Sequence, residues 1–253
     1  MNLEAHSHSD FLLLWLEGPF QSWGVNSKFN RRTTLEFPTR SGILGMLCCA
    51  LGKGGTQTEL LKKMSTFSLE VFSFTKNEQS HLDAPNLMLR DFQVAGGGYD
   101  KKNLWENLMM PKTANGEMPT GTTGAKIIYK YYLQNKAFAV VLYNLQGMEV
   151  VLKNAISNPC WDIYLGRKNC IPTDYISRHE IFNSKEEALK EINVIASKKD
   201  LIEEFCVVEE ELLNKDGYEY PETLNLTDVP LQFGEYKKYT DRRITKLFKK
   251  YEC

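Results

Sequence analysis

Six consecutive large apolar residues, Phe11 to Leu16, stand between a polar N-terminal segment and the turn signal Gly18-Pro19. An uninterrupted run of this length, closed by a turn, is typical of a central strand that is buried on both faces. It is far too short to cross a membrane, which takes about 20 residues. The chain is therefore expected to fold around a sheet with this strand in its interior, after a flexible tail over residues 1–10.

Composition limits the classes of function only weakly. The chain has 253 residues, of which 42% are hydrophobic and 25% charged, and its net charge is −1. This suits a globular protein of one large or two modest domains, and any site for a polyanion must come from local clustering of Lys and Arg. The six cysteines show no Cys-x-x-Cys spacing, so neither zinc, disulfides nor a cofactor is expected. Free thiols without an export signal indicate a cytoplasmic protein.

The segment Phe37–Gly45 predicts a helix start. Pro38 ends the incoming extended chain, and Thr39 or Ser41 can accept hydrogen bonds from the first N–H groups of the helix. With Arg40 beside them, these N–H groups would suit a phosphate or a carboxylate. The alternative is that the segment only begins a well-capped buried helix, since residues 41–51 are apolar all round.

The remaining elements follow from periodicity. Strands are predicted over 67–74, 87–94, 127–133 and 137–143, and helices over 148–156 and 185–195. The order predicts an α+β layer with helices on one face of a mainly antiparallel sheet, for which a ferredoxin-like or RNA-recognition-type sheet would fit. Residues 95–125 show no period and lie between two strands, which favours a long projecting hairpin that carries Arg90, Lys101, Lys102, Lys112 and Lys126. A solvated insertion is the alternative.

Three segments together resemble the CasD family, subunit five of the CRISPR-associated proteins, in its type I-E form. They are Leu16–Gly24, Phe37–Gly45 and Tyr164–Cys170, in matching order and spacing, and Leu89-Arg90-Asp91 is similar to the family's entry into its thumb. The resemblance implies a ferredoxin-like palm over residues 11–182, a long β-hairpin thumb at about 95–125, and a small C-terminal region over 183–253.

The same resemblance implies a role in antiviral defence. A member of this family would cap the 5′ handle of a CRISPR RNA within the Cascade surveillance complex. Its neighbours would be the backbone subunit CasC and the large subunit CasA, and target DNA would be met only through the complex.

Single-stranded RNA is held by cations and N–H groups on its phosphates and by aromatic side chains on its bases. Trp23 is the candidate for stacking, with core packing as its alternative, and Gln21 and Ser22 are candidates for reading base edges or the 2′-OH. The full predicted set is Gln21, Ser22, Trp23, Lys28, Arg31, Arg32, Thr39, Arg40, Ser41, Gly42, Arg90, Lys101, Lys102, Arg167 and Lys168.

Catalysis is not expected. Relatives in type I-C systems are similar to metal-independent ribonucleases, whose chemistry needs a base near the 2′-OH and an acid near the leaving oxygen. The candidates are His81, His179, Tyr129, Tyr131 and Tyr132, and they form no matched constellation in the sequence. A non-catalytic binding subunit is therefore predicted. An endoribonuclease that processes repeat RNA and a purely protein-binding scaffold remain the alternatives.

Overall fold

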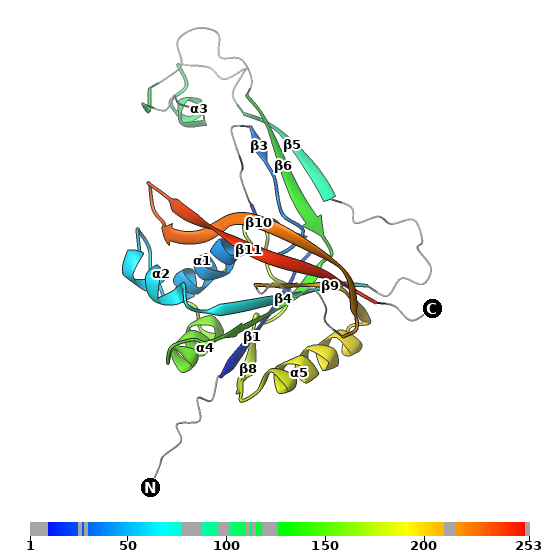
Figure 1. Ribbon diagram of the computed structural model, residues 1–253. Helices are drawn as coiled ribbons and strands as arrows, with labels where there is room; N and C mark the ends of the chain where they lie inside the picture. Colours follow the sequence, from blue (N-terminus) through cyan, green and yellow to red (C-terminus); the bar gives the residue numbers. More distant parts are fainter. Residues whose placement is uncertain are drawn as a thin grey trace.

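The structure is a computed structural model that describes residues 10–24, 27, 30–76, 88–95, 102–109, 112, 115–117, 126–209 and 216–250 (Figure 1). Its main layer is a seven-stranded sheet in which neighbouring strands are antiparallel, with the order β10-β11-β9-β4-β7-β1-β8. The strands are β1 (Phe11–Glu17), β4 (Ser68–Lys76), β7 (Ala137–Tyr143), β8 (Ser177–Phe182), β9 (Leu201–Val208), β10 (Tyr218–Gln232) and β11 (Lys238–Lys249). The predicted mixed α and β architecture with an antiparallel sheet is confirmed.

Strand β1 is buried on both faces, as its apolar run predicts. Leu12, Leu14 and Leu16 belong to one core cluster, whereas Leu13 and Trp15 belong to a second cluster on the opposite face. Alternating side chains of a strand point to opposite faces, so both faces of the sheet need apolar cover.

Helices provide that cover on both faces. The first cluster includes side chains of α1 (Arg40–Ala50), α2 (Thr58–Met64) and α4 (Glu149–Ser157), and the second those of α5 (Lys185–Lys198). The expectation that helices lie on one face only is therefore wrong. The physical reason is the apolar stripe of α5, which includes Ile192 and Ile195 and packs against the face that Leu13 and Trp15 present.

The C-terminal residues are part of the main layer. Strands β9, β10 and β11 extend the sheet beyond β4, and the long β10–β11 hairpin passes over α1 and α2 (Figure 1). At the hairpin end, Phe233 N donates to Thr56 O at 3.0 Å. The helix predicted at 185–195 is present as α5.

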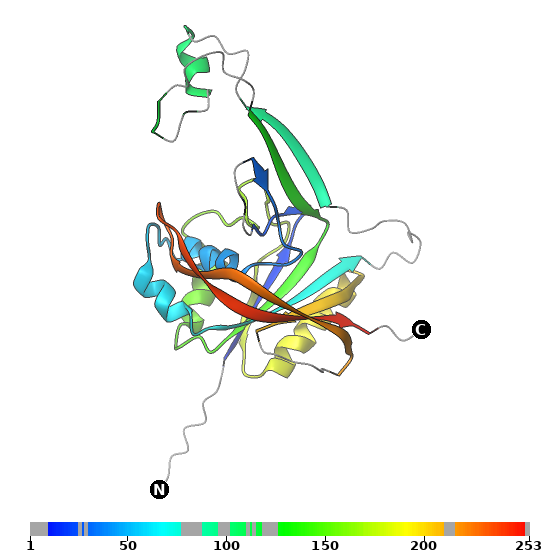
Figure 2. The same ribbon diagram turned by 45° about the horizontal axis from the view of Figure 1, so that its top comes forward.

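A second, smaller sheet rises from the first. It contains β2 (Phe20–Gln21), β3 (Arg31–Arg32), β5 (Met88–Ala95) and β6 (Lys126–Gln134), with β6 paired to each of the other three. Strands β5 and β6 form a two-stranded ribbon that projects away from the main sheet, and the short helix α3 (Leu104–Met109) lies beyond its far end (Figure 2). Within the described part of the chain, no helix is long and apolar enough to cross a membrane.

Candidate nucleic-acid interface

The predicted site residues separate into two groups. The residues that flank the helix start and follow β1 are buried, whereas those on β3, on the ribbon and in the loop after Tyr164 reach the surface. Lys28 and Lys101 lie outside the described residues, and Lys102 is exposed near α3.

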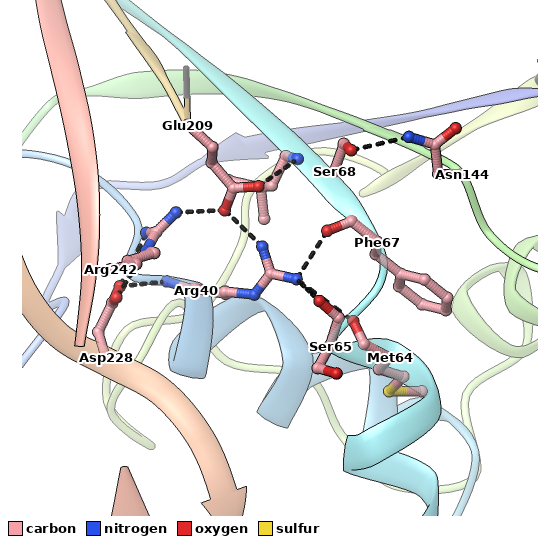
Figure 3. Close-up of polar contacts among 10 residues, drawn as sticks. Arg40, Met64, Ser65, Phe67, Ser68, Asn144, Glu209, Asp228 and Arg242 are labelled. Atoms are coloured by element: carbon pink, nitrogen blue, oxygen red, sulfur yellow. Dashed lines mark hydrogen bonds and ion pairs between the residues drawn. The ribbon is translucent and has the colours of Figure 1, made fainter. Parts of the chain in front are cut away.

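Arg40 is enclosed by the protein, with 4% of its surface exposed (Figure 3). Its guanidinium donates to Glu209 and, through Nη2, to the carbonyl oxygens of Ser65 at 2.9 Å and Phe67 at 2.6 Å. Burial of a charge is expensive unless it is paired and hydrogen-bonded, and these contacts meet both conditions. Arg40, which the sequence places among the RNA-binding residues, thus has its guanidinium buried and engaged within the protein.

The charged partners of Arg40 come from the C-terminal strands and the residue that follows β9. Arg242 donates through Nε to Asp228 Oδ1 at 2.6 Å and also bonds Glu209, so two arginines share two carboxylates. Burial alone would lower the pKa of Arg242, but the hydrogen bonds and charges of Asp228 and Glu209 outweigh it and the pKa is raised. The cluster of Arg40, Glu209, Asp228 and Arg242 ties α1 to the end of β9 and to β10 and β11 (Figure 3).

The N-terminus of α1 already holds an anion from within the chain. Thr39 is the N-cap and its side chain accepts from Gly42 N, which confirms the predicted cap. The backbone N–H of Arg40 donates to Asp228 Oδ2 at 2.7 Å. The helix start thus binds a carboxylate, one of the two anions that the sequence predicts, and that carboxylate belongs to β10.

Gln21 and Trp23 serve the core. Gln21 is fully buried, its amide donates to Leu16 O and Lys136 O, and it accepts from Trp23 Nε1 at 3.1 Å. Trp23 is 1% exposed and lies against Gly42, where an added Cβ would stand 2.8 Å from Trp23 Cε3. Neither side chain is available to a base, so the core-packing alternative for Trp23 is confirmed.

Ser22 also makes its hydrogen bonds within the protein. Its hydroxyl donates to Tyr131 O at 3.0 Å and its backbone N–H donates to Leu165 O at 3.1 Å. Buried Thr39 and half-buried Ser41 share a hydrogen bond. Ser22 thus joins β6 to the 164–170 loop, whereas Thr39, Ser41 and Gly42 form the start of α1.

Arg167 fastens β3 to β6. Its guanidinium lies over the Tyr132 ring at 4.8 Å and donates to Arg32 O at 2.7 Å and Tyr131 O at 3.3 Å. Strand β3 runs parallel to β6, with Arg31 opposite Tyr129 and Arg32 opposite Lys130. Both β3 side chains are exposed, as is Lys168 in the neighbouring loop.

The ribbon adds aromatic surface to these cations. Phe92 stands opposite Tyr129 in the β5–β6 register, their ring centroids are 5.7 Å apart, and Phe92 is 55% exposed. The Arg90 guanidinium lies 5.9 Å from the Tyr129 ring. Directly paired residues share a face of a sheet, so Arg31, Arg90, Phe92 and Tyr129 form one surface, called here the ribbon face.

Phe92 and Tyr129 are absent from the set of RNA-binding residues predicted from the sequence. The sequence could have pointed to Phe92, because alternate residues of a strand share a face and residues 88–94 were predicted to be a strand. Phe92 was therefore expected on the same face as Arg90. The ribbon face can bind single-stranded nucleic acid, because its cations suit phosphates and its exposed ring suits a base.

Comparison with known proteins decides the family. The family model described as CRISPR-associated protein (Cas_Cas5) matches residues 11–245. The chain belongs to the CRISPR-associated Cas5 family. Among curated Cas5 relatives, it is 29% identical over 163 residues to the CRISPR system Cascade subunit CasD of Escherichia coli strain K12, a match that covers 63% of this chain and spans 66% of the length of CasD.

Solved structures agree with the Cas5 assignment. A chain of a CRISPR RNA-guided surveillance complex matches with a TM-score of 0.66 and 25% identity, covering 94% of this chain and 90% of that one. A crystal structure of a Cas protein matches with a TM-score of 0.58 and 20% identity over 95% of both chains, which supports the fold alone.

Proposed function

We propose that this protein is a non-catalytic RNA-binding subunit of a type I-E Cascade surveillance complex, where it holds the 5′ handle of the guide RNA in antiviral defence. Membership of the Cas5 family and the similarity to CasD support this role. The observation that carries it is the ribbon face, where exposed Arg31 and Arg90 flank the ring pair of Phe92 and Tyr129. Arg32 and Lys168 are further exposed cations outside the ribbon face.

We further propose that the β5–β6 ribbon and the segment at its end are the thumb, and that β1, α1, β4, β7, α4 and β8 are a ferredoxin-like palm. The order of these elements, strand-helix-strand-strand-helix-strand, and their sheet order β8-β1-β7-β4 support the palm. The pairing of Met88 with Leu133 through Ala95 with Lys126 supports the thumb. On this proposal CasC and CasA are neighbours, CRISPR RNA is the ligand, and the protein is cytoplasmic.

The test is binding of an RNA oligonucleotide that carries the repeat-derived 5′ handle, measured by fluorescence anisotropy over a series of salt concentrations. Affinity should fall as salt rises, because bound phosphates release counterions. Arg31→Glu should weaken binding and flatten the salt dependence. Lys190→Glu makes the same charge change at an exposed residue of α5, on the far side of the main sheet, and should leave binding unchanged.

The rivals give different results in related assays. A purely protein-binding scaffold would show no salt-dependent binding of the oligonucleotide, and Arg31→Glu would change nothing in this assay. A ribonuclease would cut repeat RNA at one site in the presence of EDTA. Of the catalytic candidates, His81 and the side chain of His179 lie outside the described residues, whereas Tyr132 is buried and its hydroxyl accepts from Asn169 Nδ2 at 3.1 Å.

A further inference from the structure

A pocket of about 360 Å³ opens beside the first residues of β5. This volume lies in the range of roughly 300 to 1,000 Å³ that is typical of small-ligand sites. Its lining comes from four parts of the chain that are distant in sequence, namely Phe20, residues 89–92, Tyr132 and Asn169. The pocket thus sits where the ribbon leaves the main sheet.

One wall of the pocket is apolar and held in place. Leu89 stands opposite Tyr132 in the β5–β6 register, and the Phe20 ring centroid lies 6.0 Å from that of Tyr132. The Tyr132 ring also contacts the Arg167 guanidinium, and its hydroxyl accepts from Asn169. A wall fixed by this many contacts can receive a flat ring at little cost in conformational entropy.

The polar group of the pocket is the half-buried carboxylate of Asp91. It stands two residues from Leu89 and therefore on the same face of β5. Gln93 Nε2 donates to Asp91 Oδ2 at 2.7 Å, the only hydrogen bond of this carboxylate within the described residues. Because a carboxylate has about four acceptor positions, Asp91 keeps capacity for further donors.

We infer that the pocket receives a single nucleobase of the bound RNA and that Asp91 selects guanine. Guanine alone among the four bases presents two adjacent N–H donors, N1–H and N2–H, on its Watson–Crick edge, and a carboxylate can accept both. The exposed Arg32 and the half-buried Asp91 both pair with Lys130, from opposite sides of β6, so Arg32 shares the face of Asp91 and supplies a cation for the phosphate of the same nucleotide. This inference rests on the proposed RNA binding and adds base selection to it.

The experiment uses the full chain and eight-nucleotide RNAs in which a single guanosine is moved through oligouridylate. At one position guanine should bind about 5- to 150-fold more tightly than uracil, the range for a good bidentate pair. Inosine at that position, which lacks the N2 amino group, should lose most of the gain. This control changes the RNA and is independent of protein folding.

Two protein variants complete the test. Asp91→Asn keeps the side-chain shape and should abolish the preference for guanine. Asp241→Asn removes the same charge at an exposed position of β11 and should keep the preference. A preference that survives in Asp91→Asn, or no guanine preference at any position while salt-dependent binding persists, would overturn the pocket and leave the proposed function standing. Failure of the wild-type protein to bind any of these RNAs would overturn both.

Discussion

The carbonyl oxygen of Ser22 lies so close to Gly166 that a Cβ added to this glycine would stand 1.9 Å from it. Gly166 also has φ +95°, a left-handed conformation that side chains disfavour. The adjacent hydrogen bond from Ser22 N to Leu165 O locks the same contact. Two segments separated by more than half of the chain therefore meet backbone to backbone, and only glycine permits this approach.

Gly166→Ala is expected to lower the free energy of unfolding by about 2 to 6 kcal/mol, since it adds a backbone clash to an unfavourable φ. Urea denaturation monitored by circular dichroism measures the loss. Gly147→Ala is the matched control, because Gly147 has φ +74° but open space around its Cβ position. It should cost only about 1 to 2 kcal/mol, the conformational part. Equal losses in the two variants would contradict the contact.

Arg40→Ala should destabilise the protein by about 3 to 5 kcal/mol, because it removes the buried guanidinium that pairs with Glu209 and that donates to the carbonyl oxygens of Ser65 and Phe67. Arg31→Ala removes the same charge from an exposed position and should change stability by less than about 0.5 kcal/mol. Denaturation curves of the two variants make the comparison. A stable Arg40→Ala protein with weakened RNA binding would show that Arg40 acts at the surface after all.

Substitutions at Arg31 and Arg40 should also differ in their effect on RNA binding. Arg31→Ala should reduce the slope of log affinity against log salt by about 0.7, the value for one phosphate of a single strand. A conservative Arg40→Lys variant, examined at a temperature where it remains folded, should keep the wild-type slope. The reverse pattern would count against the ribbon face.

Gly42→Ala should be destabilising by about 1 to 3 kcal/mol, because the new methyl group meets the Trp23 ring. In a Trp23→Leu background the part of that penalty that comes from the ring should vanish, leaving the similarly close contact with Thr39 Oγ1. A double-mutant cycle measured by thermal unfolding gives the coupling energy. Additive effects of the two substitutions would contradict the packing of Trp23 on α1.

Stability should fall in alkaline solution partly through Cys48. Burial, and then the neighbouring Cys49, raises the pKa of Cys48 from 9.0 to about 11. Above pH 9 the unfolded thiol ionises while the folded one stays protonated, so this contribution to stability is present below pH 9 and is lost as the pH rises to about 11. Urea denaturation at pH 8, 9 and 10 should show a shallower decline for Cys48→Ala than for the wild type.

Local patterns predicted the elements well because their causes are local. The apolar run of β1, the cap at Thr39 and the alternation in β4 each act within a few residues. The positions of the candidate site residues could not be predicted in this way, because they depend on contacts between residues that are distant in sequence. Arg40 looks like a surface cation until Glu209 and Asp228 come beside it from the far end of the chain.

The role of Trp23 also depends on a contact that its neighbours in the sequence do not reveal. A tryptophan after a strand suits a stacking platform or a core equally, and the decision depends on Gly42 lying beneath its ring. By contrast, the exposure of Arg31, Arg32 and Arg90 was predictable, since an arginine side chain is mostly exposed unless it is paired. The pairing of β3 with β6, which gathers these cations, was not.

The arginine cluster also bears on how the chain is made. Arg40 leaves the ribosome 169 residues before its partner Glu209, an interval of roughly ten to thirty seconds at typical rates of synthesis. During that time α1 carries a charge that cannot be buried unpaired, and β4 lacks its neighbour β9. The N-terminal half of the protein therefore stays incomplete until β9, β10 and β11 have been synthesised.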